Sequence, residues 1–145
     1  MLYADSSALV RAYFQDEDDH RVLRDLLLES GERVVTSELA RIELASAIQS
    51  ADRAGRIRDA QALEQSIEVD FDVGGPLILL DLDARVTLPT AHKLVREHRL
   101  RTLDAIHLAV ALEDAPAYAG ADEVVLVTRD ADQAAAAQAL GLAVR

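Results

Sequence analysis

Short apolar runs alternate along the chain with longer stretches in which apolar residues recur every three or four positions. The short runs are typical of buried strands and the longer stretches of amphipathic helices. Strands are predicted at 1–4, 33–37, 77–82, 122–129 and, as a short last strand, 142–144. Helices are predicted at 7–14, 20–30, 38–54, 56–71, 83–98, 103–114 and 130–140. This alternation predicts an α/β fold with a central, mostly parallel sheet of about four to five strands and helices on both faces.

Glycine, serine and proline set the expected ends of several helices. Gly31, Gly55 and Gly141 each follow a helical stretch, where a glycine commonly ends a helix. Ser37 is predicted to cap the helix at 38–54. Pro89 lies inside the stretch 83–98 and is expected either to start that helix or to kink it.

The helix predicted at 20–30 carries apolar side chains on more than one of its faces. They are Val22, Leu23, Leu26, Leu27 and Leu28. One interpretation is that part of this stripe is exposed in a monomer and binds a partner or a second copy of the chain. The alternative is that the helix is buried in the chain's own core.

The composition fits a single domain over residues 1–145. The chain has three Tyr, two Phe and no Trp, so the core must be built from aliphatic side chains. The absence of Cys excludes disulfides and thiolate metal sites. No apolar run reaches the roughly 18 residues of a membrane span, and the first residues lack the basic start of a signal peptide. We therefore expect a soluble, cytoplasmic protein with no membrane contact.

The formal net charge is −11, from 26 acidic and 15 basic residues. A protein that binds nucleic acid through bulk charge is basic, so the composition disfavours that class. The acids are then either solvated surface or partly gathered around a divalent cation, which could itself meet an anionic substrate.

Two acids directly follow predicted strands. Asp5 comes after the strand at 1–4, and Asp130 after the strand at 122–129. If these strands are parallel neighbours, both carboxylates lie at the sheet edge where α/β proteins bind ligands. Each acid also precedes a helix, and taken singly each is more simply explained as an N-cap.

Glu43 lies on the inward-facing side of its predicted helix, in line with Leu39 and Ala47. A buried, unpaired glutamate is costly. Glu43 is therefore either paired with an arginine, such as Arg11 or Arg101, or faces a small polar cavity lined by Ala and Ser.

Asp104 stands at the head of an almost wholly apolar helix, 103–114. A helix this apolar is buried, so its first turn points into the protein or into a cleft. The simplest explanation is that an acid in the first turn suits the helix dipole. The other is that Asp104 belongs to a site.

The joint placement of these acids favours a site. We predict Asp5, Glu43, Asp104 and Asp130 as catalytic, with Asp5, Asp104 and Asp130 binding a metal ion. Clustered carboxylates cannot all stay ionised unless a cation joins them, and oxygen ligands suit Mg²⁺ or Mn²⁺. Such an ion assists phosphodiester hydrolysis. Asp132 is a possible fifth acid, and whether it or Asp130 faces the metal stays open.

Other polar residues are assigned supporting roles. Ser7 and Thr128 are expected to hydrogen-bond the acids, and His107 is interpreted as a structural hydrogen-bonder rather than a base. Arg99 and Arg101, close before Asp104, are predicted to contact a substrate phosphate, the alternative being an ordinary solvated face.

Four segments together resemble a known family, the PIN-domain ribonucleases, and in particular the VapC-like toxins of type II toxin–antitoxin pairs. The segments are "YADSSALV", "SELARIELASAI", "LRTLDAIHLAVAL" and "VLVTRDADQAAAAQALGL". The third is the most specific, and the additional acid Asp132 in the fourth departs from the family pattern. The resemblance implies a Mg²⁺- or Mn²⁺-dependent endoribonuclease that acts on RNA, forms a homodimer and is bound by a small VapB-like antitoxin.

Rival classes fit the sequence less well. A receiver domain needs a lysine late in the chain, but Lys93 is the only lysine and is misplaced. A haloacid-dehalogenase-like phosphatase needs Asp-x-Asp after the first strand, whereas Asp5 is followed by Ser6 and Ser7. A catalytically silent module that binds metal or an antitoxin remains open.

Overall fold

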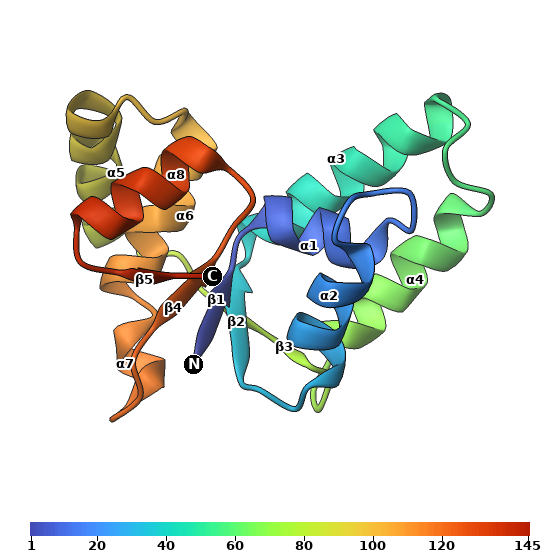
Figure 1. Ribbon diagram of the computed structural model, residues 1–145, viewed down its shortest axis with the longest axis horizontal. Coiled ribbons are helices and arrows are strands. Elements are labelled where there is room, and N and C mark those ends of the chain that lie inside the picture. Colours follow the sequence, from blue (N-terminus) through green and yellow to red (C-terminus); the bar gives the residue numbers. More distant parts are fainter.

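The computed structural model covers residues 1–145 and has three layers, a parallel sheet between two layers of helices (Figure 1). The five strands are β1 (Leu2–Ala4), β2 (Val34–Ser37), β3 (Leu77–Leu80), β4 (Val125–Val127) and β5 (Ala143–Val144). They lie in the order β3-β2-β1-β4-β5, and every neighbouring pair is parallel. The predicted α/β fold with a mostly parallel sheet is confirmed.

Each face of the sheet is covered by its own set of helices. One layer consists of α1 (Ser6–Tyr13), α2 (His20–Arg24), the π-helix η1 (Asp25–Glu29), α3 (Leu39–Arg53) and α4 (Ala60–Asp70). The other consists of α5 (Ala84–His98), α6 (Thr102–Glu113), α7 (Pro116–Ala119) and α8 (Ala131–Ala139). Each layer packs on a separate apolar cluster of 17 buried residues.

The strands supply both clusters because successive side chains point to opposite faces of a sheet. In β1, Leu2 and Ala4 belong to the cluster under α1–α4, while Tyr3 belongs to the cluster under α5–α8. In β2, Val34 and Val35 divide in the same way. Burial on both faces explains why these strands read as unbroken apolar runs.

The helix predicted at 20–30 differs from the structure in form and in exposure. It is α2 continued by the π-turn of η1. Leu23 and Leu27 are fully buried in the core of their own layer, and Leu26 and Leu28 pack against it. Only Val22 is exposed, at 61%. Of the two interpretations of this helix, the exposed apolar stripe is wrong, and burial in the chain's own core is confirmed.

Other boundaries shifted by a few residues. The helix expected from residue 56 begins at Ala60, where the Asp59 carboxylate accepts a hydrogen bond from the Ala62 amide at 2.9 Å. Helix α5 begins at Ala84 and runs through Pro89, so the proline does not start it. The short helix α7 was not predicted. No helix is both long and apolar enough to cross a membrane.

Candidate functional site

The candidate site lies at the carboxyl ends of β1 and β4. These strands pair directly, with Ala4 opposite Val127. The Asp5 backbone N–H continues the pairing by donating to the Val127 carbonyl at 3.1 Å. The predicted shared edge for Asp5 and the residues after β4 is thus present in the structure.

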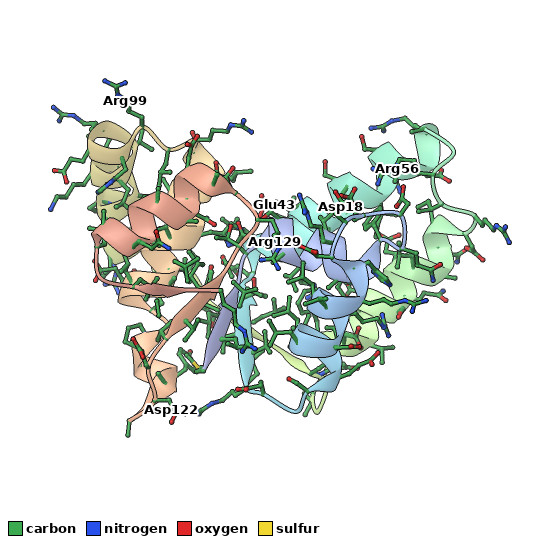
Figure 2. All side chains as sticks on the ribbon, viewed as in Figure 1. Asp18, Glu43, Arg56, Arg99, Asp122 and Arg129 are labelled. Atoms are coloured by element: carbon green, nitrogen blue, oxygen red, sulfur yellow. The ribbon has the colours of Figure 1, made fainter.

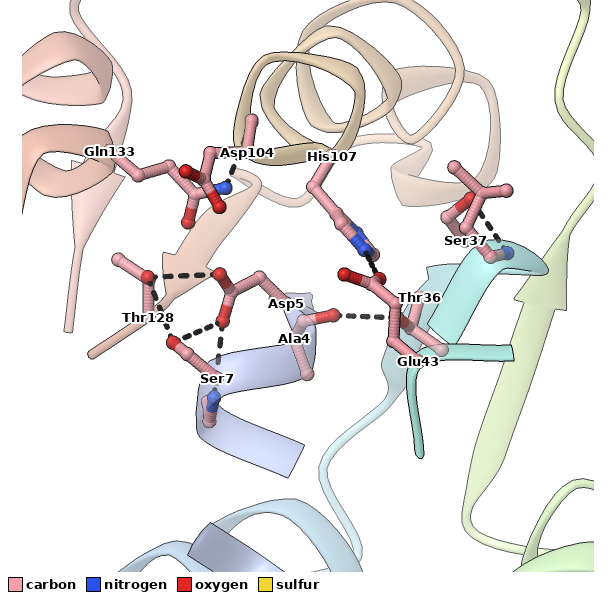
Figure 3. Close-up of polar contacts among 12 residues, drawn as sticks. Ala4, Asp5, Ser7, Thr36, Ser37, Glu43, Asp104, His107, Thr128 and Gln133 are labelled. Carbon is pink, nitrogen blue, oxygen red and sulfur yellow. Dashed lines mark hydrogen bonds and ion pairs between the residues drawn. The ribbon is translucent and has the colours of Figure 1, made fainter. Parts of the chain in front are cut away.

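Asp5 is buried, at 2% exposure, in a set of hydrogen bonds (Figure 3). Its Oδ1 accepts from the Ser7 hydroxyl at 2.7 Å and from the Ala8 amide at 3.1 Å, and its Oδ2 accepts from the Thr128 hydroxyl at 3.1 Å. The bond to Ala8 caps α1, so Asp5 is an N-cap and an edge acid at once. Burial raises the pKa of Asp5, while the nearby His107 and the three hydrogen bonds oppose the rise.

The two hydroxyls predicted as supporting groups tie the segment after β4 to α1. The Thr128 oxygen also accepts from the Asp130 amide at 3.0 Å, and the Ser7 oxygen accepts from the Arg129 amide at 2.8 Å. Each hydroxyl therefore serves both a carboxylate and a backbone N–H. The start of α8 is fixed relative to Asp5 by these two side chains.

Asp130 caps α8, its Oδ1 accepting from the Gln133 amide at 2.8 Å. The Gln133 side chain is fully buried, and its Nε2 donates to the Asp104 carbonyl at 3.0 Å, which joins the start of α8 to the start of α6. Asp132 is exposed in the first turn of α8. This placement favours Asp130 over Asp132 as the acid that faces the site.

Asp104 is the acid whose charge interacts with those of the other three predicted catalytic acids. Its side chain is partly buried in the first turn of α6 and makes no hydrogen bond or ion pair with another protein group. Burial raises the pKa of Asp104, and the charges of Asp130, Asp5 and Glu43 raise it further, opposed by Arg101. The other three predicted catalytic acids are therefore each within electrostatic reach of Asp104.

Glu43 reaches the site from α3, in the opposite helical layer. Its Oε2 accepts a hydrogen bond from Nε2 of His107 at 2.5 Å. The predicted pairing with Arg11 or Arg101 is wrong, because the imidazole of α6 takes that place. Glu43 also lines an open cavity of about 350 Å³, which is lined as well by Ser6, Ser7, Val10, Arg11 and Glu17 and by no alanine.

The contacts of His107 agree with its interpretation as a structural hydrogen-bonder. It is 1% exposed, and its Nδ1 lies 3.0 Å from the Tyr3 hydroxyl. Burial, reinforced by the Asp5 charge, raises the pKa of Tyr3 well above its ordinary range, so this hydroxyl is protonated at neutral pH. Sequence reasoning missed that the other partner of His107 is a predicted catalytic acid. The available signal was a lone imidazole on an apolar helix, which must find partners when buried.

The two predicted RNA-binding arginines are placed differently. Arg101 precedes α6, and its charge lowers the pKa of Asp104, so it lies within electrostatic reach of the acids. Arg99 lies at the end of α5, well away from Glu43 (Figure 2). The structure brings Arg101, but not Arg99, to the acids.

The donor set at this edge suits a hard divalent cation that keeps much of its water. No group of three or more His, Cys, Asp or Glu side chains is arranged to hold a metal ion. Mg²⁺ is commonly bound through only one or two carboxylates, with waters completing its shell. The oxygens here that lack a protein donor include those of the Asp104 carboxylate and the buried Oε1 of Gln133. These oxygens fit a hydrated Mg²⁺ or Mn²⁺, but not a cation enclosed by protein ligands.

Comparisons with known proteins agree with this architecture. The family model for the PIN domain matches residues 2–139. The crystal structure of VapC20 from Mycobacterium tuberculosis, described as a sarcin–ricin loop cleaving toxin, is similar with a TM-score of 0.66 and 18% identity, over 94% of this chain and 95% of that one. PAE2754 from Pyrobaculum aerophilum is similar with a TM-score of 0.64 and 21% identity, over 93% of this chain and 83% of that one. No curated protein matches the sequence.

Identities this low establish a common fold, while the family match rests on the sequence itself. That match spans all four predicted acids and nearly every element of the sheet. PIN domains are generally nucleases that use divalent metals. The chain belongs to the PIN domain family.

Proposed function

We propose that the protein is a metal-dependent endoribonuclease that acts as the toxin of a toxin–antitoxin pair. The observation that carries the proposal is the electrostatic coupling at Asp104. Burial raises the pKa of Asp104 most, and the charges of acids from three other elements, the ends of β1 and β4 and helix α3, raise it further. Like charges held together at the ligand-binding edge of a parallel sheet are costly unless a cation or a proton joins them.

In the proposed mechanism Asp5, Asp104 and Asp130 would hold a Mg²⁺ or Mn²⁺ ion that keeps much of its water shell. A bound ion would neutralise charge on the scissile phosphodiester and make a coordinated water more acidic. Glu43 faces the adjoining cavity and accepts a proton from the attacking water. Arg101 supplies a positive charge beside Asp104 that attracts a substrate phosphate.

Partners follow from the same proposal. The chain shares its fold with VapC20, a toxin by its description, and by resemblance we propose an RNA substrate, a small VapB-like antitoxin and a homodimer. Sedimentation of the purified chain, alone and with a co-expressed antitoxin, tests both assemblies. A monomer at every concentration with no co-purifying partner would contradict them.

The decisive experiment incubates purified, antitoxin-free protein with total RNA, with and without Mn²⁺. Cleavage that requires Mn²⁺, is stopped by excess EDTA and is lost in Asp104→Asn is the expected result. Cleavage undiminished by EDTA would refute the mechanism.

A second candidate is a catalytically silent PIN-like module that binds an antitoxin. It is favoured by the lack of three side chains arranged to hold a metal. In that case the same experiment would show antitoxin binding without RNA cleavage at any Mn²⁺ concentration.

A further inference from the structure

A buried row of polar groups connects the centre of the sheet to Glu43. Tyr3 of β1 is completely buried, His107 of α6 nearly so, and Glu43 of α3 is half-buried at the cavity. The Tyr3 hydroxyl lies 3.0 Å from His107 Nδ1, and His107 Nε2 lies 2.5 Å from Glu43 Oε2. The row therefore begins at a fully buried side chain of the central strand and ends at a candidate catalytic carboxylate.

The partners of His107 fix which ring nitrogen carries a proton. An ionised carboxylate only accepts hydrogen bonds, so Nε2 must be protonated to contact Glu43. This holds whether the ring is neutral or charged. The Tyr3 hydroxyl can donate to a bare Nδ1 or accept from a protonated one, so it suits both forms.

The contact also spans the two helical layers. Glu43 extends from the α1–α4 layer and His107 from the α5–α8 layer, and the two side chains meet above the ends of the strands (Figure 3). A glutamate side chain at a cavity samples several rotamers unless something holds it. His107 holds Oε2 and leaves Oε1 of Glu43 without a protein donor, available to a water or substrate in the cavity.

We propose that His107 is a positioning residue that, anchored by Tyr3, fixes the Glu43 carboxylate for proton transfer. The proposal rests on the proposed nuclease function. His107 is nearly inaccessible and contacts Glu43 rather than substrate, so its effect is exerted through Glu43. Positioning of a catalytic group by a second side chain follows the general logic of a base and its orienting partner.

The first test compares RNA cleavage by variants that differ in one hydrogen bond. His107→Leu removes the donor to Glu43 and should lower kcat at least tenfold with little change in KM. His107→Gln keeps an amide donor on a side chain of similar reach and should recover most of the loss. Adding Glu43→Gln to His107→Leu should cost little more than Glu43→Gln alone, since both act on one group.

Leu108→Ala is the matched control. Leu108 is fully buried next to His107 in α6, belongs to the apolar cluster of the α5–α8 layer, and has no hydrogen-bonding group to offer Glu43. Its truncation should destabilise the fold through a cavity while leaving kcat per folded molecule unchanged. If His107→Leu behaves as Leu108→Ala does, with normal kcat in the folded fraction, His107 is only a core residue and the proposal is overturned.

A nuclear magnetic resonance measurement of the unmodified protein separates this inference from the nuclease proposal. Long-range ¹H–¹⁵N correlation at neutral pH should show Nε2 of His107 protonated, with a proton signal that shifts in Glu43→Gln. Tyr3→Phe should broaden or move the ring signals by removing the anchor at Nδ1. A bare Nε2 overturns the inference whether or not RNA is cleaved. A protonated, Glu43-sensitive Nε2 in a protein that cleaves no RNA would refute the nuclease function while supporting the contact.

Discussion

Asp5 and Asp104 are both proposed ligands of one cation, yet the fold holds them in opposite ways. Asp5 is buried and accepts three hydrogen bonds, two from hydroxyls and one from the amide that it caps. Asp104 is partly exposed and its carboxylate accepts none from the protein. Asp5 thus joins β1, α1 and the end of β4 through its hydrogen bonds. The Asp104 carboxylate is positioned by helix α6 alone and interacts with its neighbours only through charge.

The pKa of each of these acids is raised, but the opposing groups differ. At Asp5 the nearby His107 and the three hydrogen bonds favour the ionised form against burial. At Asp104 only the charge of Arg101 opposes burial and three neighbouring acids. The comparison indicates that hydrogen bonds formed on folding fix the acid on the strand side, and that repulsion among acids is left at the helix side.

The largest expected effect is common to both acids. Asp5→Asn and Asp104→Asn should each reduce Mn²⁺-dependent RNA cleavage by about a hundredfold or more, the order of losing one group that stabilises the transition state. Initial rates at saturating RNA provide the measurement. Full activity in either variant would reduce that acid to a helix cap or a dipole-stabilised residue.

Stability should then separate the two acids. Asp5→Ala leaves the Ser7 and Thr128 hydroxyls and the Ala8 amide without their acceptor, and should lower the free energy of unfolding by about 1–3 kcal/mol. Asp104→Ala removes a repelled charge without breaking a side-chain hydrogen bond, and should raise the free energy of unfolding of the metal-free protein. Urea unfolding in EDTA measures both. A lower stability for Asp104→Ala would show that Asp104 stabilises its helix, and the contrast would fail.

The pH dependence of stability is a smaller effect with a definite sign. Because the pKa values of Asp5 and Asp104 lie above their ordinary value of 3.8, the folded state binds more protons than the unfolded chain. The resulting stabilisation is complete below pH 3.8 and is lost as pH rises through the raised pKa values. Mn²⁺ binds the folded, deprotonated site and should restore stability at higher pH. Melting curves at several pH values should show this fall in EDTA, its reversal by Mn²⁺, and a flatter profile for Asp104→Asn; a rise with pH in EDTA would contradict it.

The smallest expected effect belongs to the additional acid of the fourth motif. Asp132 is exposed in α8, so Asp132→Asn should change the free energy of unfolding by less than about 0.5 kcal/mol and leave Mn²⁺ affinity unchanged. Asp130→Asn, at the cap two residues earlier, should weaken Mn²⁺ binding measured by calorimetry. The reverse result would place Asp132 at the cation in place of Asp130.

Sequence patterns predicted what depends on neighbours along the chain. An apolar run that ends in Asp5, and a second that ends near Asp130, sufficed to place both acids at one sheet edge. The partner of Glu43 could not be predicted in this way, because His107 lies 64 positions away on a helix of the other layer. A helical wheel shows which face is inward, but not which side chain arrives from across the sheet.

Neighbours along the chain were also insufficient to decide which side chains of the helix predicted at 20–30 are exposed. Its apolar residues cover more than one face at a regular helical period, which left both an exposed stripe and full burial open. In the structure the second half of the stretch is the π-turn η1, and Leu27 within it is buried in the core. The sequence has no simple signal for such a turn, since it is stabilised by the tertiary packing that it makes possible.

The sheet order also affects when activity can arise during synthesis. Strand β1 lies between β2 and β4, and the hydroxyl that Thr128 offers to Asp5 is 123 positions further along the chain. While the ribosome is still extending the chain towards β4, one side of β1 has no neighbour, and Thr128, Asp130 and Gln133 do not yet exist. A nascent polypeptide therefore carries Asp5 and Glu43 without the groups that complete the site. On the proposed function, cleavage therefore cannot begin until β4 and α8 have been translated and have docked on β1 and α6.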